Sequence, residues 1–285
     1  MESWKQKGVL FLVSFGVSLG ADFDTNNSLI EFYGKSDSRT NIVIKDNIDI
    51  EGKITSAGSV ALNDNKASSN AFLIQKLIDA NFNIAGKANL SEWANFRSEN
   101  SVSGWSSKGG QTTHVLNSKY NPCGSSSGSA VAVASGLVDI AIGTETNGSI
   151  SCPSSINGII GFKPTVGLVS RSGIIPISSS QDTAGPMGKT LEIVAKTLEV
   201  ISGYDPNDKA TSYIPEDFNF NFVGVTNNKR LDGIRFGLLN ADNQHPQVIE
   251  FHNEIKAVVK KLGGEVIDIK DDRIYPDEAE YFILL

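Results

Sequence analysis

Two loops rich in glycine and serine, each joined to a run of small apolar residues, limit most strongly what this chain can fold into. The first loop covers residues 121–129 (NPCGSSSGS), and the apolar run 130–136 follows it. The second covers residues 143–150 (GTETNGSI) and follows the apolar run 138–142. Glycine and serine let backbone N–H groups approach a reacting centre where larger side chains would clash. A hydroxyl on such a loop can act as a nucleophile, and neighbouring N–H groups can stabilise an oxyanion.

Three other classes of loop fit these residues less well. A flexible linker would not lie between apolar helix- and strand-forming segments. A Walker loop ends in Gly-Lys-Ser/Thr, but no lysine occurs between Lys119 and Lys163. A serine–histidine hydrolase needs a histidine after its serine; His114 precedes the first loop, and His245 and His252 lie in a polar region. The loops therefore favour a serine nucleophile that uses a base other than histidine.

Lys45 is the candidate base. It follows three apolar residues in the segment 41–45 (NIVIK), a pattern that indicates the end of a buried strand. A lysine in this place has two alternatives: it pairs with Asp46 or Asp49, or it loses its charge. Burial favours the loss of charge because it lowers the lysine pKa, and the neutral amine can then accept a proton. On spacing alone, the structural ion pair is favoured over the base. Lys87 follows another short apolar strand, and a structural role is favoured for it as well.

Longer motifs make the chain resemble the amidase signature family. The first are Lys45-Asp-Asn, the two loops above and Gly161-Phe-Lys-Pro-Thr165, in the family's order. Further segments are similar to its peptide-amidase-like branch: 86–97, 103–106, 109–112, 170–177 and 180–186. The resemblance covers about residues 40 to 284. It implies an α/β fold with a mixed β-sheet covered by helices, incomplete at the C-terminal end.

The resemblance also implies roles for individual residues. Ser149 would be the nucleophile, Ser125 a bridging serine on a cis peptide bond, and Lys45 the base. The oxyanion hole would be formed by the backbone N–H groups of Thr146, Asn147, Gly148 and Ser149. The implied reaction is hydrolysis of linear carboxamides, such as C-terminal peptide amides, through an acyl-enzyme and without a metal or cofactor. The partner is then a small-molecule or peptide amide substrate.

One departure from the family narrows the function. Many relatives carry an arginine directly after Gly-Ser-Ile, where this chain has Ser151 and then Cys152. An alternative function is the glutaminase subunit of a tRNA-dependent amidotransferase. That subunit usually carries the arginine, so its absence here weakens this alternative. Asn147 stands where relatives have glycine or aspartate, and its side chain is a candidate to face the substrate. Nearby, Asp182 fits loop hydrogen bonding better than direct substrate contact.

The two cysteines flank the candidate site. Cys123 lies two residues before Ser125, and Cys152 lies three residues after Ser149. If the two serines come within hydrogen-bond reach, the cysteines approach each other as well. A disulfide then requires Cα atoms within about 7 Å. Export would permit this oxidation, whereas two buried, reduced thiols are the commoner arrangement.

Both ends of the chain differ from the family. Lys5 and Lys7 precede the apolar run 8–19 and small residues up to position 21, which predicts a signal peptide over residues 1–21 and export; an ordinary N-terminal helix is the alternative. The run is too short to span a membrane. Residues 22–285 would form a partial amidase signature domain. The apolar end 281–285 predicts truncation and self-association, and makes a catalytically inactive remnant the second functional hypothesis.

Composition and periodicity agree with one large or two smaller α/β domains in 285 residues. A net charge of −7 with dispersed lysines and arginines argues against nucleic-acid binding, and two cysteines with three scattered histidines give little support for a metal site. Strands are predicted at 83–86, 138–144, 234–239 and 265–269. Helices are predicted from a Ser69-Asn70 cap to residue 80, at 130–136, from a Thr190 cap to near 203, and at 247–262, with a polar connection over 205–230.

Overall fold

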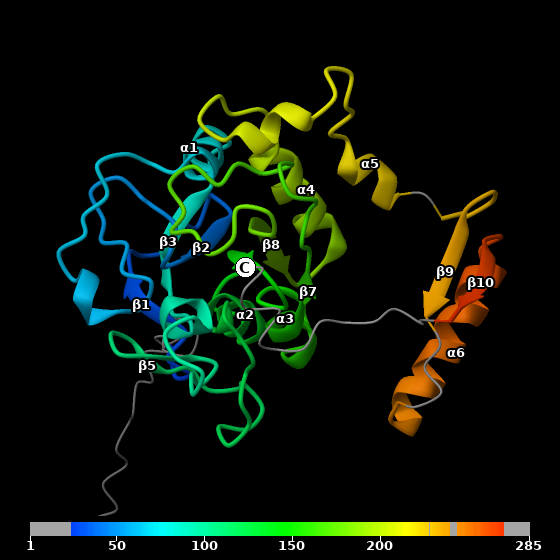
Figure 1. The fold of residues 1–285 in the computed structure, drawn as a ribbon, viewed down its shortest axis with the longest axis horizontal. Helices are drawn as coiled ribbons and strands as arrows, with labels where there is room; N and C mark the ends of the chain where they lie inside the picture. Colours follow the sequence, from blue (N-terminus) through cyan, green and yellow to red (C-terminus); the bar gives the residue numbers. More distant parts are fainter. Residues whose placement is uncertain (1–23, 228, 240–243, 271–285) are drawn as a thin grey trace, which may run out of the picture.

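The computed structural model describes residues 24–227, 229–239 and 244–270 (Figure 1). The predicted signal peptide and the apolar end 281–285 lie outside these residues. A six-stranded sheet forms the centre, in the order β1-β3-β2-β6-β8-β7. Its strands are β1 (Leu29–Phe32), β2 (Asn41–Lys45), β3 (Asn83–Ala88), β6 (Ile140–Glu145), β7 (Ile160–Gly161) and β8 (Thr183–Gly188). β2 runs parallel to β3 and β6, whereas β8 runs antiparallel to β6. The predicted mixed sheet is confirmed.

The central strands are apolar on both faces because helices cover both sides of the sheet. On one side lie α1 (Phe72–Asp79) and α4 (Leu191–Ile201), and on the other lies α2 (Ser127–Ala134). The other helices of the described chain are α3 (Ser151–Ile156), α5 (Phe222–Thr226) and α6 (Pro246–Lys261). Ile42 and Ile44 of β2 pack in one core cluster with residues of α1 and α4. Val43 points to the opposite face and packs with Ala132 and Val133 of α2. The alternation along β2 therefore divides the core into two layers.

Two helix boundaries differ from the prediction. α1 begins at Phe72 with Ala71 as its N-cap, not at Ser69-Asn70, because the Asn70 side chain accepts a hydrogen bond from the Glu51 N–H at 2.8 Å. α2 begins at Ser127, three residues before the predicted start, so the end of the serine-rich loop forms its first turn. The predicted start of α4 is confirmed: Thr190 Oγ1 accepts from the Ile193 N–H at 3.3 Å.

Short elements join these parts. Three are 3₁₀ turns, at Val60–Leu62, Glu92–Asn95 and Lys209–Tyr213, and β4 (Trp105–Ser106) pairs with β5 (Gly110–Gln111). The connection over 205–230, for which only a polar character was predicted, contains the last of these turns and α5. This connection forms helical turns because Asp208 and Asn221 cap them by accepting backbone hydrogen bonds.

The C-terminal part forms the predicted strand–helix–strand unit. β9 (Arg235–Leu239) and β10 (Glu265–Ile269) are parallel and flank α6 in sequence. Gly263 adopts a φ of +92°, a left-handed conformation that ends α6 and that glycine adopts without steric cost. Figure 1 shows this unit set apart from the six-stranded sheet. Among the described residues, no helix is both long enough and apolar enough to cross a membrane.

Candidate active site

Lys45 and Ser125 meet at the carboxyl end of β2. Because β2 and β6 are parallel neighbours, their last residues lie at the same edge of the sheet, and the loop before α2 crosses this edge. The Lys45 Nζ lies 2.7 Å from Ser125 Oγ, 2.9 Å from Thr144 Oγ1 and 3.1 Å from the Thr144 carbonyl oxygen. Thr144 belongs to β6 and was not identified from the sequence. Its position five residues before Ser149 is the feature that could have identified it.

The surroundings of Lys45 favour its neutral form. The side chain is completely buried, and burial lowers the pKa of Lys45 to about 7, although Glu145 and Asp182 oppose the shift from a distance. A neutral amine has two N–H donors and one lone pair. The amine lies within hydrogen-bond distance of both Thr144 oxygens and of Ser125 Oγ, so in its neutral form it can donate to Thr144 and direct its lone pair to the Ser125 hydroxyl.

The ion pair that spacing favoured for Lys45 belongs to Lys87 instead. The Lys87 Nζ lies 3.2 Å from Asp46 Oδ1 and donates to the Ile48 carbonyl oxygen at 2.6 Å. Both charged groups are buried, and the other oxygen of Asp46 accepts hydrogen bonds from Ser56. Burial lowers the pKa of Lys87, and Asp46 opposes this shift. These contacts confirm the structural role predicted for Lys87.

The two candidate serines lie on adjoining segments. The Gly124–Ser125 peptide bond is cis, in agreement with the family resemblance. The Ser126 N–H donates to the Ser149 carbonyl oxygen at 3.1 Å, which joins the first loop directly to the second. Ser149 is buried, with 8% of its surface exposed, and its hydroxyl makes no hydrogen bond within the described residues. Among the described residues, the hydroxyls of Ser125 and Ser149 thus form no hydrogen bond with each other, although a proton relay would require one.

One of the four expected oxyanion-hole donors is already engaged. The Gly148 N–H donates to the Glu145 carboxylate at 2.8 Å, so Gly148 is unsuited to this role. The N–H groups of Thr146, Asn147 and Ser149 have no acceptor in the described part of the chain. Loops that leave backbone donors unpaired next to a nucleophile can stabilise a developing oxyanion.

Glu145 organises the loop of the candidate nucleophile Ser149, although the sequence did not single it out. Besides Gly148, its carboxylate accepts from the N–H groups of Ile150 and Ser151, at 2.7 and 2.8 Å. Burial by itself raises the pKa of Glu145, but these backbone donors and Lys163 bring it below its ordinary value. Its place at the end of the apolar strand, four residues before Ser149, was the signal that could have identified it.

Two cavities border this edge of the sheet. The first, of about 300 Å³, is lined among others by Thr144, Thr146 and Asp182, and the second, of about 250 Å³, by Trp93 and Phe96. Both walls share Asn47 and the segment 175–177. Trp93 is therefore part of a cavity wall. The walls of neither cavity contain the side chains of the two serines or the lysine described above.

Asp182 supports the wall of the first cavity. Its carboxylate accepts hydrogen bonds from Thr146 Oγ1 and from the N–H groups of Ile177 and Ser178. The predicted loop-bonding role of Asp182 is confirmed. These contacts connect the loop 143–150 to the segment 175–178, of which residues 175–177 line both cavities.

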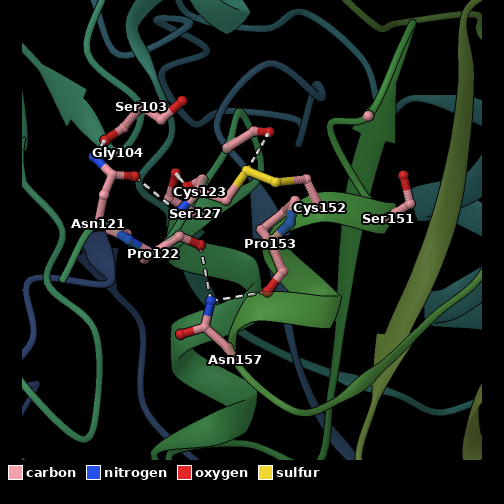
Figure 2. Close-up of a disulfide and its surroundings, with 12 residues drawn as sticks. Ser103, Gly104, Asn121, Pro122, Cys123, Ser127, Ser151, Cys152, Pro153 and Asn157 are labelled. Atoms are coloured by element: carbon pink, nitrogen blue, oxygen red, sulfur yellow. Dashed lines mark hydrogen bonds between the residues drawn. A yellow bond between two sulfur atoms is a disulfide. The ribbon is translucent and has the colours of Figure 1, made fainter. Parts of the chain in front are cut away.

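A disulfide joins the two serine-bearing segments. Cys123 and Cys152 are bridged, with their Cα atoms 6.0 Å apart (Figure 2). The commoner arrangement, two buried and reduced thiols, is therefore not present in this structure. The Asn157 side chain donates to the carbonyl oxygens of Pro122 and Pro153, the neighbours of the two cysteines in sequence, at 2.9 and 2.8 Å (Figure 2).

A family model described as Amidase matches residues 41–283. This chain belongs to the amidase family. It is 41% identical over 244 residues to a putative amidase of Arthroderma benhamiae, covering 84% of this chain and 41% of the relative. The native peptide amidase of Stenotrophomonas maltophilia superposes with a TM-score of 0.80 at 42% identity, covering 86% of this chain and 54% of that one.

A second group of relatives consists of amidotransferase subunits. A glutamyl-tRNA(Gln) amidotransferase subunit from Trichodesmium erythraeum is 36% identical over 249 residues, covering 85% of this chain and 50% of the relative. The chain thus spans about half the length of the amidase-family proteins that it matches.

Proposed function

We propose that this amidase-family chain hydrolyses linear carboxamides through Lys45, Ser125 and Ser149. One observation carries the proposal: a completely buried lysine amine lies 2.7 Å from a serine hydroxyl and has no carboxylate partner within the described residues. Its lowered pKa, about 7, supplies a general base near neutral pH. The hydrogen bond from the Ser126 N–H to the Ser149 carbonyl oxygen keeps the backbone of Ser149 next to the loop that carries Ser125.

In the proposed reaction, Lys45 accepts the Ser125 proton while Ser125 accepts the proton of Ser149. The Ser149 oxygen attacks the amide carbonyl, after a side-chain rotation that brings its hydroxyl to Ser125. The unpaired N–H groups of Thr146 and Asn147 then stabilise the oxyanion. The relay returns a proton to the leaving nitrogen, ammonia or an amine departs, and water hydrolyses the acyl-enzyme. This sequence of steps uses no metal or cofactor.

The substrate class is proposed from similarity and from the cavities. The matched structure from Stenotrophomonas maltophilia is named a peptide amidase, so C-terminal peptide amides are the first substrates to test. The cavity lined by Trp93 and Phe96 suits an apolar side chain of such a peptide, whereas the cavity at Thr146 is lined by more polar residues.

The similarity to amidotransferase subunits supports a second candidate function, that of a glutaminase component of such a complex. Ser151, in the place of the arginine that marks this subgroup, argues against it. A glutaminase of this kind would need partner subunits and tRNA for full activity. Carboxamide hydrolysis by the isolated chain that is unaffected by tRNA would favour the amidohydrolase.

Ser149→Ala tests the proposed function. Because the nucleophile forms the covalent intermediate, we expect release of ammonia from a peptide amide to fall by at least about 10³-fold. Ser155→Ala is the matched control, since Ser155 is exposed on α3 and its side chain makes no hydrogen bond in the described chain. Equal activity of Ser149→Ala and its parent would refute the assignment. A parent without activity on any carboxamide would favour the inactive remnant.

A further inference from the structure

The Cys123–Cys152 bridge connects the two segments that carry the candidate catalytic serines. Cys123 precedes Ser125 by two residues, and Cys152 follows Ser149 by three. Their Cα atoms are 6.0 Å apart, although 29 positions separate them in sequence. Within the described residues, this is the only covalent link between parts of the chain that are distant in sequence.

The first segment is held in an uncommon backbone conformation at the bridge. Cys123 has a φ of +60°, a left-handed conformation that residues other than glycine and asparagine seldom adopt. Its N–H donates to Asn121 Oδ1 at 2.8 Å, and its carbonyl oxygen accepts from Ser127 Oγ at 2.6 Å. Because Ser125 lies only two residues on, a change at Cys123 changes the direction of the segment that carries the Ser125 hydroxyl.

The second segment is connected to the bridge within one helical turn. The Cys152 N–H donates to the Gly148 carbonyl oxygen at 2.8 Å, so Cys152 belongs to the turn that begins at the nucleophile loop. The Ser149 hydroxyl itself makes no hydrogen bond in the described chain, so no hydrogen bond of its own fixes its position relative to Ser125.

Two non-covalent links accompany the disulfide. Asn157 donates to the carbonyl oxygens of Pro122 and Pro153, which lie next to the two cysteines (Figure 2). Farther in, the Ser126 N–H donates to the Ser149 carbonyl oxygen. These hydrogen bonds do not depend on the oxidation state, so they would keep the fold when the bridge is cut.

We propose that the Cys123–Cys152 disulfide is a positioning element of the active site, and that its reduction reversibly lowers turnover while the chain stays folded. The inference rests on the proposed function. A dithiol reductant supplies the chemistry: the sulfur–sulfur bond breaks, two thiols form, and the reductant is oxidised to its own disulfide. Both cysteines are partly exposed, so a small dithiol can reach the bridge.

The expected effect falls on kcat. A displacement of about 1 Å between reacting groups can cost on the order of 100-fold in rate. The walls of the two cavities contain neither cysteine, so substrate binding, and with it KM, changes little. A purely structural role would instead reduce activity only in proportion to the fraction of protein that has unfolded.

The test compares the oxidised, dithiothreitol-reduced and reoxidised full chain. Steady-state hydrolysis of a peptide amide is measured below the unfolding transition of each form, with circular dichroism as the check of the fold. We expect reduction to lower kcat by about 10- to 100-fold with KM nearly unchanged, and reoxidation to restore it. In Cys123→Ser/Cys152→Ser, kcat should be low from the start and insensitive to the reductant.

Several results would overturn the inference: two titratable thiols in the denatured, unreduced protein, an unchanged kcat after reduction, or a loss that matches the unfolded fraction. If the oxidised chain hydrolyses no carboxamide, the proposed function fails, and hydrogen exchange decides the inference separately. Faster exchange at residues 123–126 and 148–152 after reduction, with the rest of the sheet unchanged, supports the positioning role. Equal exchange in both redox forms contradicts it.

Discussion

Two buried lysines on neighbouring strands differ in one contact, which distinguishes the candidate base Lys45 from the structural cation Lys87. Lys45 ends β2 and Lys87 lies in β3, and both are completely buried. Burial lowers the pKa of each. Lys87 meets the Asp46 carboxylate at 3.2 Å, which favours its ammonium form. Lys45 meets the uncharged oxygens of Thr144 and Ser125, which leave its amine available to accept a proton.

The state of Lys45 predicts how activity depends on pH. Below its pKa of about 7 the amine is protonated and cannot act as a base. The value of kcat/KM should therefore fall about tenfold for each pH unit below about 7 and level off above it. The measurement is a pH profile, from about pH 5 to 9, with a peptide amide that does not itself titrate in this range. A flat profile would exclude Lys45 as the base.

At the scale of elements, α2 places the first loop by packing unusually closely against the backbone beside β3. Gly128 lies in the first turn of α2, and its N–H donates to the Asn89 carbonyl oxygen at 2.9 Å. A Cβ atom at this position would lie 2.2 Å from the Ser28 carbonyl oxygen and 2.5 Å from that of Asn89. Because backbone atoms surround the site, no side-chain rotation can make room.

Gly128→Ala should therefore destabilise the chain and displace the loop that carries Ser125. We expect the free energy of unfolding to fall by about 1–3 kcal/mol, the usual cost of overpacking, in spite of the better helix propensity of alanine. Denaturant unfolding followed by circular dichroism measures the change. Ser135→Ala, at the exposed end of the same helix, is the control and should stay within about 0.5 kcal/mol of the parent. A Gly128→Ala variant as stable as the parent would contradict this prediction, because it would mean that the surrounding backbone moves apart at little cost.

At the scale of the whole molecule, the unit of β9, α6 and β10 exposes an apolar stripe. Val248, Phe251 and Val258 lie at helical spacing on α6, and their exposures are 40%, 60% and 53%. On β10, Ile267 and Ile269 are also partly exposed. The sheet β9–β10 has two strands only, so each strand has an unpaired edge within the described residues.

These surfaces predict concentration-dependent self-association of the 285-residue chain. Light scattering over a range of concentrations should show a rising average mass. Phe251→Ser should reduce the association, because it removes the largest exposed side chain of the stripe. Tyr213→Ser is the control, since Tyr213 is 80% exposed but lies in the 3₁₀ turn after α4. A monodisperse monomer at all concentrations would contradict the prediction.

Local patterns in the chain were enough to predict the strand that ends in Lys45, the Thr190 cap of α4, the β9–α6–β10 unit and the two serine loops, because periodicity and capping act over a few neighbouring residues. They could not distinguish Lys45 from Lys87. Which lysine meets Asp46 depends on the register between β2 and β3, two strands that are far apart in the chain. For the same reason, the engagement of Gly148 by Glu145 and the pairing of the two cysteines emerged only from three-dimensional packing, which alone brings distant groups into contact.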